Sequence, residues 1–484
     1  MAYTTIDKHT LHFNQKNYTG TGSSLALTGV GFQPDFTWIK NRTAGSGADH
    51  ILIDSLRGVT KALNSNDNSI EDTISNSLTA FGTDGFTVNG NGATGASGDT
   101  YASWNWKAGG AAPTQTYKVV VVSDSGNKYR FRNTADTATF GASAVTLDLQ
   151  EGGTYTFDVS DSTLNSHPFV IGTAANGTEY STGVTYKLDG VTKTYSQYTS
   201  GFSAATSRQL IITVANSAPA LYYWCSAHSG MGGAINTNTT FGSSNFDGNI
   251  QTLVSTNTTA GFSIVKWTGD GSASATIGHG LGGKIDQVWQ KDLTATDSWH
   301  VFSKGMTAGY NLYFNNDGTN QNPADGSIDN FTTTTFGFNA NGGNVNAVNE
   351  NNIPCVAYCF RSITGYSSFG TYKGNGNSVN GPMVYTGFKP SMILVKKMDA
   401  SGFWVFSDKN RNNRSDTVSN GANRWLYANV TNVEYDAASY PVDLLSMGFK
   451  IKHNGGYQNT ANTYIYAAFG QSVVGSNNVP ATAR

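Results

Sequence analysis

The stretch GFQPDFTWIK, from Gly31 to Lys40, returns later in the chain as GFKPSMILVK (Gly387 to Lys396) and, more loosely, as GGKIDQVWQK (Gly282 to Lys291). A motif that recurs in one chain indicates internal duplication, so repeats are sought before any other feature. Apolar residues such as Phe36 and Trp38 alternate with other residues within the motif, which is typical of a β-strand. The motif therefore predicts a strand at the same place in three related modules.

Further landmarks surround each copy of the motif in the same order. An aromatic residue and a glycine turn precede it, in YTGTG (Tyr18 to Gly22), WTGDG (Trp267 to Gly271) and YKGNG (Tyr372 to Gly376). An aromatic strand closes each module, in YASWNW (Tyr101 to Trp106), CVAYCF (Cys355 to Phe360) and YIYAAF (Tyr464 to Phe469). Landmarks that keep their order three times predict three diverged repeats of about 95 residues, each an antiparallel β-sandwich with its own small core.

The composition supports strands and excludes several classes of function. Among 484 residues, aromatics make up 12% and charged residues 13%, the net charge is −2, and 56 residues are glycine. Such a chain is rich in strand and turn formers. It lacks the basic face of a nucleic-acid-binding protein and the basic segment of an electrostatic membrane anchor. We also expect no secretory signal and no membrane-spanning segment, because no long apolar run occurs.

Between the first two repeats lies a stretch that does not follow the pattern. It contains His167 and, in the loop sequence CSAHSGM, Cys225, His228 and Met231. One mid-chain histidine followed by Cys, His and Met in one late loop resembles the cupredoxin family, the blue-copper β-sandwiches. Two imidazoles and a thiolate in a plane, with a weak axial thioether, form the ligand set of such copper sites.

The cupredoxin resemblance implies a metal site at His167, Cys225, His228 and Met231, with copper as the one candidate cofactor. Two alternatives stay open. The former ligands could pack as a small polar cluster without metal. The short loop also resembles the copper-A loop of cytochrome oxidase subunits, although the second cysteine of that motif is absent.

The predicted fold class is all-β, a multi-domain chain of β-sandwich modules in which three diverged repeats accompany one cupredoxin-like Greek-key sandwich. The expected domains are residues 1–112 for repeat 1, 113–236 for the cupredoxin-like domain, 250–366 for repeat 2 and 367–484 for repeat 3.

Other reactive side chains suggest structure rather than catalysis. Cys355 and Cys359 lie four residues apart on a predicted strand, too far apart for a disulfide, and are expected to fill the core. Asp54 and Asp408 recur at matching places, but the second copy has Ser303 there, so we expect a turn-forming role. His9 and His12 are expected to be solvated. No catalytic residue stands out, and the chain is not expected to be an enzyme.

The whole combination resembles virion proteins of marine tailed bacteriophages, including those that infect cyanobacteria. The resemblance rests on GFQPDFTWIKNR (Gly31 to Arg42) with the landmarks that follow it, and on YYWCSAHSGMGG (Tyr222 to Gly233). It implies a structural or host-binding protein of the particle, assembled in the host cytoplasm, and a tail fibre or spike that attaches to host-surface glycans is the first expectation.

The expected partners are other virion proteins, a host glycan or protein receptor, and further copies of the chain, with a homotrimer favoured; neither nucleic acid nor membrane insertion is expected. Two alternatives remain. One is a capsid decoration or tail structural protein without receptor binding, and the other is a copper-binding electron-transfer protein.

Overall fold

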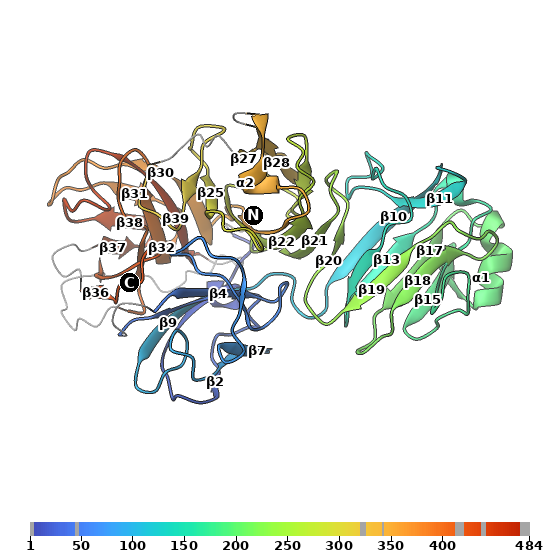
Figure 1. The fold of residues 1–484 in the computed structure, drawn as a ribbon, viewed down its shortest axis with the longest axis horizontal. Helices are drawn as coiled ribbons and strands as arrows, with labels where there is room; N and C mark the ends of the chain where they lie inside the picture. The colour runs from blue at the N-terminus through green and yellow to red at the C-terminus, as the bar shows by residue number, and fades with distance from the viewer. Residues whose placement is uncertain are drawn as a thin grey trace. The chain divides into compact units, whose positions relative to one another are not determined.

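The computed structural model describes residues 4–43, 48–319, 326–340, 343–411, 421–436 and 442–474. Their regular secondary structure is almost entirely β-strand (Figure 1). The chain forms two compact units. The repeat unit comprises Met1–Ala108, Thr256–Ala275 and Leu281–Arg484, whereas the insert unit comprises Gly109–Ser255 and Thr276–Gly280. The predicted all-β class is confirmed. No α-helix among the described residues is long and apolar enough to cross a membrane.

Repeat 1 consists of two main sheets, with strand orders β1-β9-β3-β4 and β2-β8-β7, and a short β5-β6 pair. Its elements are η1 (His9–Leu11), β1 (Phe13–Thr19), β2 (Leu25–Leu27), β3 (Phe36–Asn41), β4 (His50–Asp54), β5 (Lys61–Ala62), β6 (Asp72–Thr73), β7 (Leu78–Gly82), β8 (Gly85–Val88) and β9 (Thr100–Trp106). Strand β3 is buried along its whole length because a sheet neighbour lies on each side and other layers cover both faces.

Repeat 2 has the same inner sheet, in the order β22-β29-β24-β25-β26, and a β28-β27 pair that corresponds to β8-β7. Its elements are β22 (Phe262–Thr268), β24 (Gln287–Asp292), β25 (His300–Ser303), β26 (Leu312–Tyr313), β27 (Ser327–Asp329), β28 (Thr335–Asn339), α2 (Asn346–Asn349) and β29 (Pro354–Phe360).

Repeat 3 follows the same plan in the sheets β30-β39-β32-β33-β35-β36 and β31-β38-β37-β34. Its elements are β30 (Ser367–Lys373), β31 (Met383–Tyr385), β32 (Lys389–Lys397), β33 (Val405–Asp408), β34 (Gly421–Ala422), β35 (Arg424–Tyr427), β36 (Tyr435–Asp436), β37 (Val442–Leu445), β38 (Gly448–Ile451) and β39 (Thr463–Gln471).

Strand register shows that the repeats are equivalent residue by residue. The motif strand pairs with the closing aromatic strand in all three repeats, through Phe36↔Trp106, Gln287↔Phe360 and Met392↔Phe469. The same motif residues pair on their other side with Asp54, Ser303 and Asp408. The order and pairing of the four inner strands thus place the three sequence copies on one template.

The three repeats meet at an aromatic centre. The equivalent side chains Trp106, Phe360 and Phe469 contact one another, with ring-centroid distances of 6.4, 5.6 and 5.9 Å for the three pairs. Trp38 and Trp289, equivalent residues of the motif strands, lie 5.8 Å apart edge to face. Each outer sandwich also has an apolar core of its own in repeats 1 and 3. The expectation of separate small cores thus holds for the outer sandwiches of repeats 1 and 3. It did not include the aromatic core that the three inner sheets share.

A ring of hydrogen bonds closes around this centre, with one bond from each repeat to the next. The bonds run between equivalent residues: His50 Nε2 to Tyr427 O (2.9 Å), Trp404 Nε1 to Tyr313 O (2.7 Å) and Trp299 Nε1 to Asn64 O (2.7 Å). His50 can donate from Nε2 because its Nδ1 accepts a bond from Trp38 Nε1. Repeat 1 therefore contacts repeat 3, repeat 3 contacts repeat 2, and repeat 2 contacts repeat 1, so the repeat unit has an internal pseudo-threefold arrangement.

The insert unit contains two sheets, β11-β10-β13-β17-β15-β16 and β12-β19-β18-β14, which form a β-sandwich. Its elements are β10 (Thr114–Ser123), β11 (Asn127–Phe131), β12 (Leu147–Gln150), β13 (Thr154–Asp158), η2 (Ser162–Leu164), β14 (Phe169–Gly172), β15 (Val184–Leu188), β16 (Val191–Lys193), α1 (Tyr195–Gly201), η3 (Phe202–Ala204), β17 (Arg208–Thr213), β18 (Leu221–Cys225), β19 (Ala234–Asn238), β20 (Ser243–Asn245), β21 (Thr252–Asn257) and β23 (Thr276–Gly278). One aromatic-rich core fills the space between the two sheets.

Candidate metal centre of the insert unit

Strand pairing brings the predicted metal ligands together at one end of the insert unit. His167 lies two residues before Phe169, which begins β14, and Cys225 ends β18. The two strands are antiparallel neighbours, and Phe169 is the register partner of Cys225. The loop from β18 to β19 then places His228 beside them, so residues about sixty positions apart in the chain converge.

Three side-chain atoms form a small triangle. His167 Nδ1 lies 3.0 Å from His228 Nδ1, and Cys225 Sγ lies 3.6 Å from His228 Nδ1 and 3.9 Å from His167 Nδ1. A metal bound at about 2.0–2.1 Å from nitrogen and 2.3 Å from sulfur holds such donors about 3.4–3.8 Å apart in tetrahedral or trigonal geometry. The triangle therefore fits a single ion with only small movements.

The protonation state of the ligands also suits metal binding. Burial lowers the pKa of His167, and the neighbouring His228 lowers it further, so the neutral imidazole that can bind a metal is favoured. Cys225 is a free thiol with 2% of its surface exposed, whereas His228 is exposed. A largely buried cysteine beside an accessible histidine gives an ion a route from solvent.

Neighbouring residues hold the ligands in place. Tyr129 Oη donates to the backbone oxygen of His167 at 2.9 Å, and the Ser226 backbone N–H donates to the oxygen of Pro168 at 3.0 Å. The side-chain amide of Asn127 lies 3.3 Å from His167 Nε2. This amide orients the imidazole so that Nδ1 points to the other ligands. The sequence did not identify Asn127, because it comes from a hairpin far from the ligand loop.

Met231, the fourth predicted ligand, is 1% exposed and belongs to the same apolar core as Cys225. Its backbone oxygen accepts a hydrogen bond from Tyr129 N at 2.9 Å, and the same tyrosine contacts His167. Met231 is thus fixed in the neighbourhood of the triangle, and its role as a thioether ligand stays a prediction.

The repeated aspartates are turn-forming residues. Asp54 Oδ1 accepts hydrogen bonds from the backbone N–H groups of Leu56 and Arg57. Asp408 Oδ1 accepts in the same way from the backbone N–H groups of Asn410 and Arg411. The second oxygen of Asp54 accepts from Tyr358 Oη at 2.7 Å. Both carboxylates also pair with a buried arginine.

The partners of these aspartates explain why repeat 2 has Ser303 instead of an aspartate at the matching position. Asp408 Oδ2 accepts a hydrogen bond from Trp104 Nε1, and Trp104 occupies the register position of Tyr358. The residue at that position in repeat 3 is Ala467, which has no polar side-chain atom to donate to repeat 2. Ser303 can therefore replace the aspartate without leaving a donor unpaired.

The structure also tests the expected burial of two cysteines and the expected exposure of His9. Cys355 and Cys359 are both fully buried free thiols on β29, as expected for core residues. His9, expected to be solvated, is 7% exposed and its Nδ1 lies 3.0 Å from Gln471 Oε1. The expectation for His9 is wrong because η1 packs against β39, a contact that only the tertiary fold defines.

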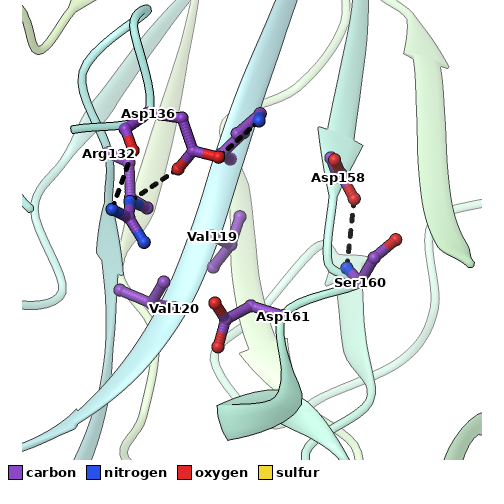
Figure 2. Close-up of a pocket in the computed structure, with 8 residues that line it drawn as sticks. Val119, Val120, Arg132, Asp136, Asp158, Ser160 and Asp161 are labelled. Atoms are coloured by element: carbon purple, nitrogen blue, oxygen red, sulfur yellow. Dashed lines mark hydrogen bonds and ion pairs between the residues drawn. The ribbon is translucent and has the colours of Figure 1, made fainter. Parts of the chain in front are cut away.

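A separate surface cavity of about 260 Å³ lies between β10, β11 and β13 of the insert unit (Figure 2). Its charged side chains neutralise one another, since Asp136 pairs with Lys118 at 2.6 Å and with Arg132 at 2.7 Å. Asp158 accepts from the backbone of Ser160 (Figure 2). Lys118, Arg132 and Asp136 thus pair with one another, and Asp161 Oδ1 accepts from Thr163 outside the cavity.

The fold and the triangle define an all-β chain in which a β-sandwich with a candidate metal centre accompanies three repeats. The sequence matches the profile of a family described as Domain of unknown function (DUF7483) over residues 8–218 and again over 189–472, and the chain belongs to this family. No curated protein matches the chain, and no solved structure matches it.

Proposed function

We propose that the chain is a non-enzymatic structural protein of a bacteriophage particle, and that it acts in a tail fibre or spike that attaches to host-surface glycans. The shared aromatic core supports this proposal, because three sandwiches joined to one centre make a rigid body whose loops can vary without loss of the frame. Rigid presentation lowers the entropy cost of binding a flexible sugar.

The observation on which the attachment proposal rests is an exposed surface of repeat 3. Val379, Met383 and Tyr385 are 82%, 48% and 65% exposed, although all three are large apolar residues. Met383 and Tyr385 lie on β31, an edge strand whose alternate residue Val384 points into the core. We call these three exposed residues the repeat 3 surface.

The loop next to this surface is ordered by its own asparagines. Asn377 Oδ1 accepts from the backbone N–H groups of Val379 and Asn380 at 2.9 and 2.7 Å, and Lys450 Nζ contacts Asn380 Oδ1 at 3.4 Å. Aromatic rings suit the apolar face of a pyranose, and amides and a lysine can bond its hydroxyl groups. A homotrimer would present the surface three times and raise avidity without new contacts.

Binding of the purified, fluorescently labelled full chain to host cells and to a glycan array tests the proposal. Tyr385→Ala should reduce binding at least 10-fold and leave the melting temperature unchanged, because the side chain is exposed. The matched control is Val191→Ala, which removes a residue of 56% exposure from the insert unit and should not affect binding. Equal binding by the wild type and Tyr385→Ala would contradict a role for this surface.

A second candidate function, copper binding, is favoured by the His167, Cys225 and His228 triangle. The donor set of one thiolate and two imidazoles with a buried methionine nearby suits copper better than calcium or magnesium, which prefer oxygen. A bound copper ion would supply one-electron redox chemistry. The chain itself would hold the ion, and Asn127 and Tyr129 would orient His167.

Addition of Cu(II) to the purified chain tests this second function. We expect one equivalent to produce an intense visible absorption from the thiolate–copper bond, and Cys225→Ser to abolish it. Cys359→Ser, which changes a buried thiol elsewhere, should keep the absorption. A colourless protein that binds Zn²⁺ instead would identify a zinc site, and no metal binding at all would leave the triangle as a polar cluster.

A further inference from the structure

A second group of potential metal ligands lies in repeat 2. Its ligands are carboxylates, unlike the thiol and imidazoles of the first group. Oxygen atoms of Asp292, Asp297 and Glu350 lie within 4.8 Å of one another. Asp292 ends β24, Asp297 lies in the loop that follows, and Glu350 comes directly after α2. The three carboxylates therefore reach one place from separate segments.

Asp292 is the unusual member of this group, since its side chain is fully buried. Its Oδ1 accepts hydrogen bonds from Gln290 Nε2 at 2.7 Å and from Cys355 Sγ at 3.0 Å. Its Oδ2 is also buried but has no hydrogen-bond partner among the described residues. A buried carboxylate oxygen without a donor is costly, so its presence calls for a partner such as a cation.

The charge around the group is only partly compensated. Lys291 Nζ donates to the backbone oxygens of Asp292 and Ala295, at 2.7 and 3.1 Å, rather than to a carboxylate. The ammonium group thus faces backbone carbonyls while three carboxylates converge beside it.

We propose that Asp292, Asp297 and Glu350 bind a calcium ion. Calcium takes oxygen ligands at 2.3–2.6 Å, so two oxygens on the same ion can lie up to about 5.2 Å apart. Oxygen atoms that lie within 4.8 Å of one another can therefore all bind one calcium ion as they stand.

The site belongs to repeat 2 alone among the three copies. The register position of Asp292 is occupied by Asn41 in repeat 1 and by Lys397 in repeat 3. Neither can serve as a carboxylate ligand. A calcium ion would join the end of β24 to the segment after α2, and so would order one edge of repeat 2 without a counterpart in the other repeats.

Calorimetric titration of the chelator-treated full chain with CaCl₂ tests the proposal. We expect one site per chain and a rise in melting temperature of at least about 3 °C in excess calcium. Glu350→Gln and Asp292→Asn should each weaken binding at least 10-fold. Asp329→Asn, a change to an acid of the same repeat outside the group, should leave it unchanged, and so should Cys225→Ser, which removes the thiol of the other centre.

Luminescence of bound Tb³⁺ gives a second readout for variants that fold poorly. Trp267 Nε1 donates to Asn349, the neighbour of Glu350, so excitation of this tryptophan should sensitise terbium at the site, and calcium should displace it. The proposal is overturned if the wild type neither binds calcium nor sensitises terbium. It is equally overturned if Asp292→Asn raises the melting temperature while calcium has no effect on either protein, because Asp292 is then only a buried protonated acid.

Discussion

Replacement of Trp106 by alanine removes the largest side chain of the aromatic trio on which all three repeats converge. Trp106 is fully buried, and its ring lies 4.9 Å from Phe13 and 5.1 Å from Phe36 as well as beside Phe360 and Phe469. Truncation of a buried tryptophan costs about 3–5 kcal/mol. Its Nε1 has no partner in the described part of the chain, and loss of that buried donor returns about 1–3 kcal/mol. We therefore expect a net loss of about 2 kcal/mol in the free energy of unfolding, from the midpoints of the two ranges.

Native-state hydrogen exchange with mass spectrometry can locate this loss. If the core is shared, the free energy of opening falls by a similar amount in β9, β29 and β39, although only β9 contains the substitution. The free energy of unfolding of Trp106→Phe should stay within about 1 kcal/mol of the wild-type value. The substitution keeps an aromatic ring at this position, removes the unpaired donor and reproduces the phenylalanine of the other two repeats.

The control is Trp224→Ala, which removes a core tryptophan of the insert unit and should not change protection in those three strands. Loss of protection in β9 alone, with β29 and β39 as protected as in the wild type, would refute the shared core. It would show instead that the three repeats are independently stable.

Two further outcomes follow from buried polar groups. Tyr358→Phe removes the hydroxyl that donates to the buried Asp54 carboxylate across two repeats, so thermal or chemical denaturation should show a loss of about 1–3 kcal/mol, and an unchanged midpoint would show that the bond contributes nothing. Burial lowers the pKa of His9 to about 4, of His300 to about 3 and of His453 to about 4, all from an unfolded value of 6.5. Each folded histidine then binds fewer protons than the unfolded one, so stability is full above pH 6.5 and falls by about 1.4 kcal/mol per pH unit for each histidine below it. A melting temperature that stays constant from pH 7 to pH 5 would contradict this.

The repeats could be predicted from the sequence, whereas their association could not. Alternating apolar residues around Trp38 and the order of the landmarks define strands and their pairing, because both depend on local spacing. An inward-facing tryptophan on one sheet, however, packs equally well inside its own sandwich or against a neighbouring sheet. The contacts of Trp106 with Phe360 and Phe469 depend on residues more than 250 positions away, and no local pattern indicates such partners.

The candidate centres show the same difference. His167, Cys225 and His228 could be identified because their types and order match a known ligand pattern, and the structure brings them within 3.9 Å. Asn127 could not, since an asparagine in a polar hairpin has no distinguishing context. The acidic group of Asp292 was equally hidden, because its three members are ordinary acids until the fold brings them together.

Immunogold electron microscopy of phage particles tests the proposed function, that of a virion attachment protein, most directly. Antibodies against the purified protein should label fibre or spike tips, and prior incubation of host cells with the purified chain should reduce particle attachment. Uniform label over the head, or particles without label, would contradict an attachment protein.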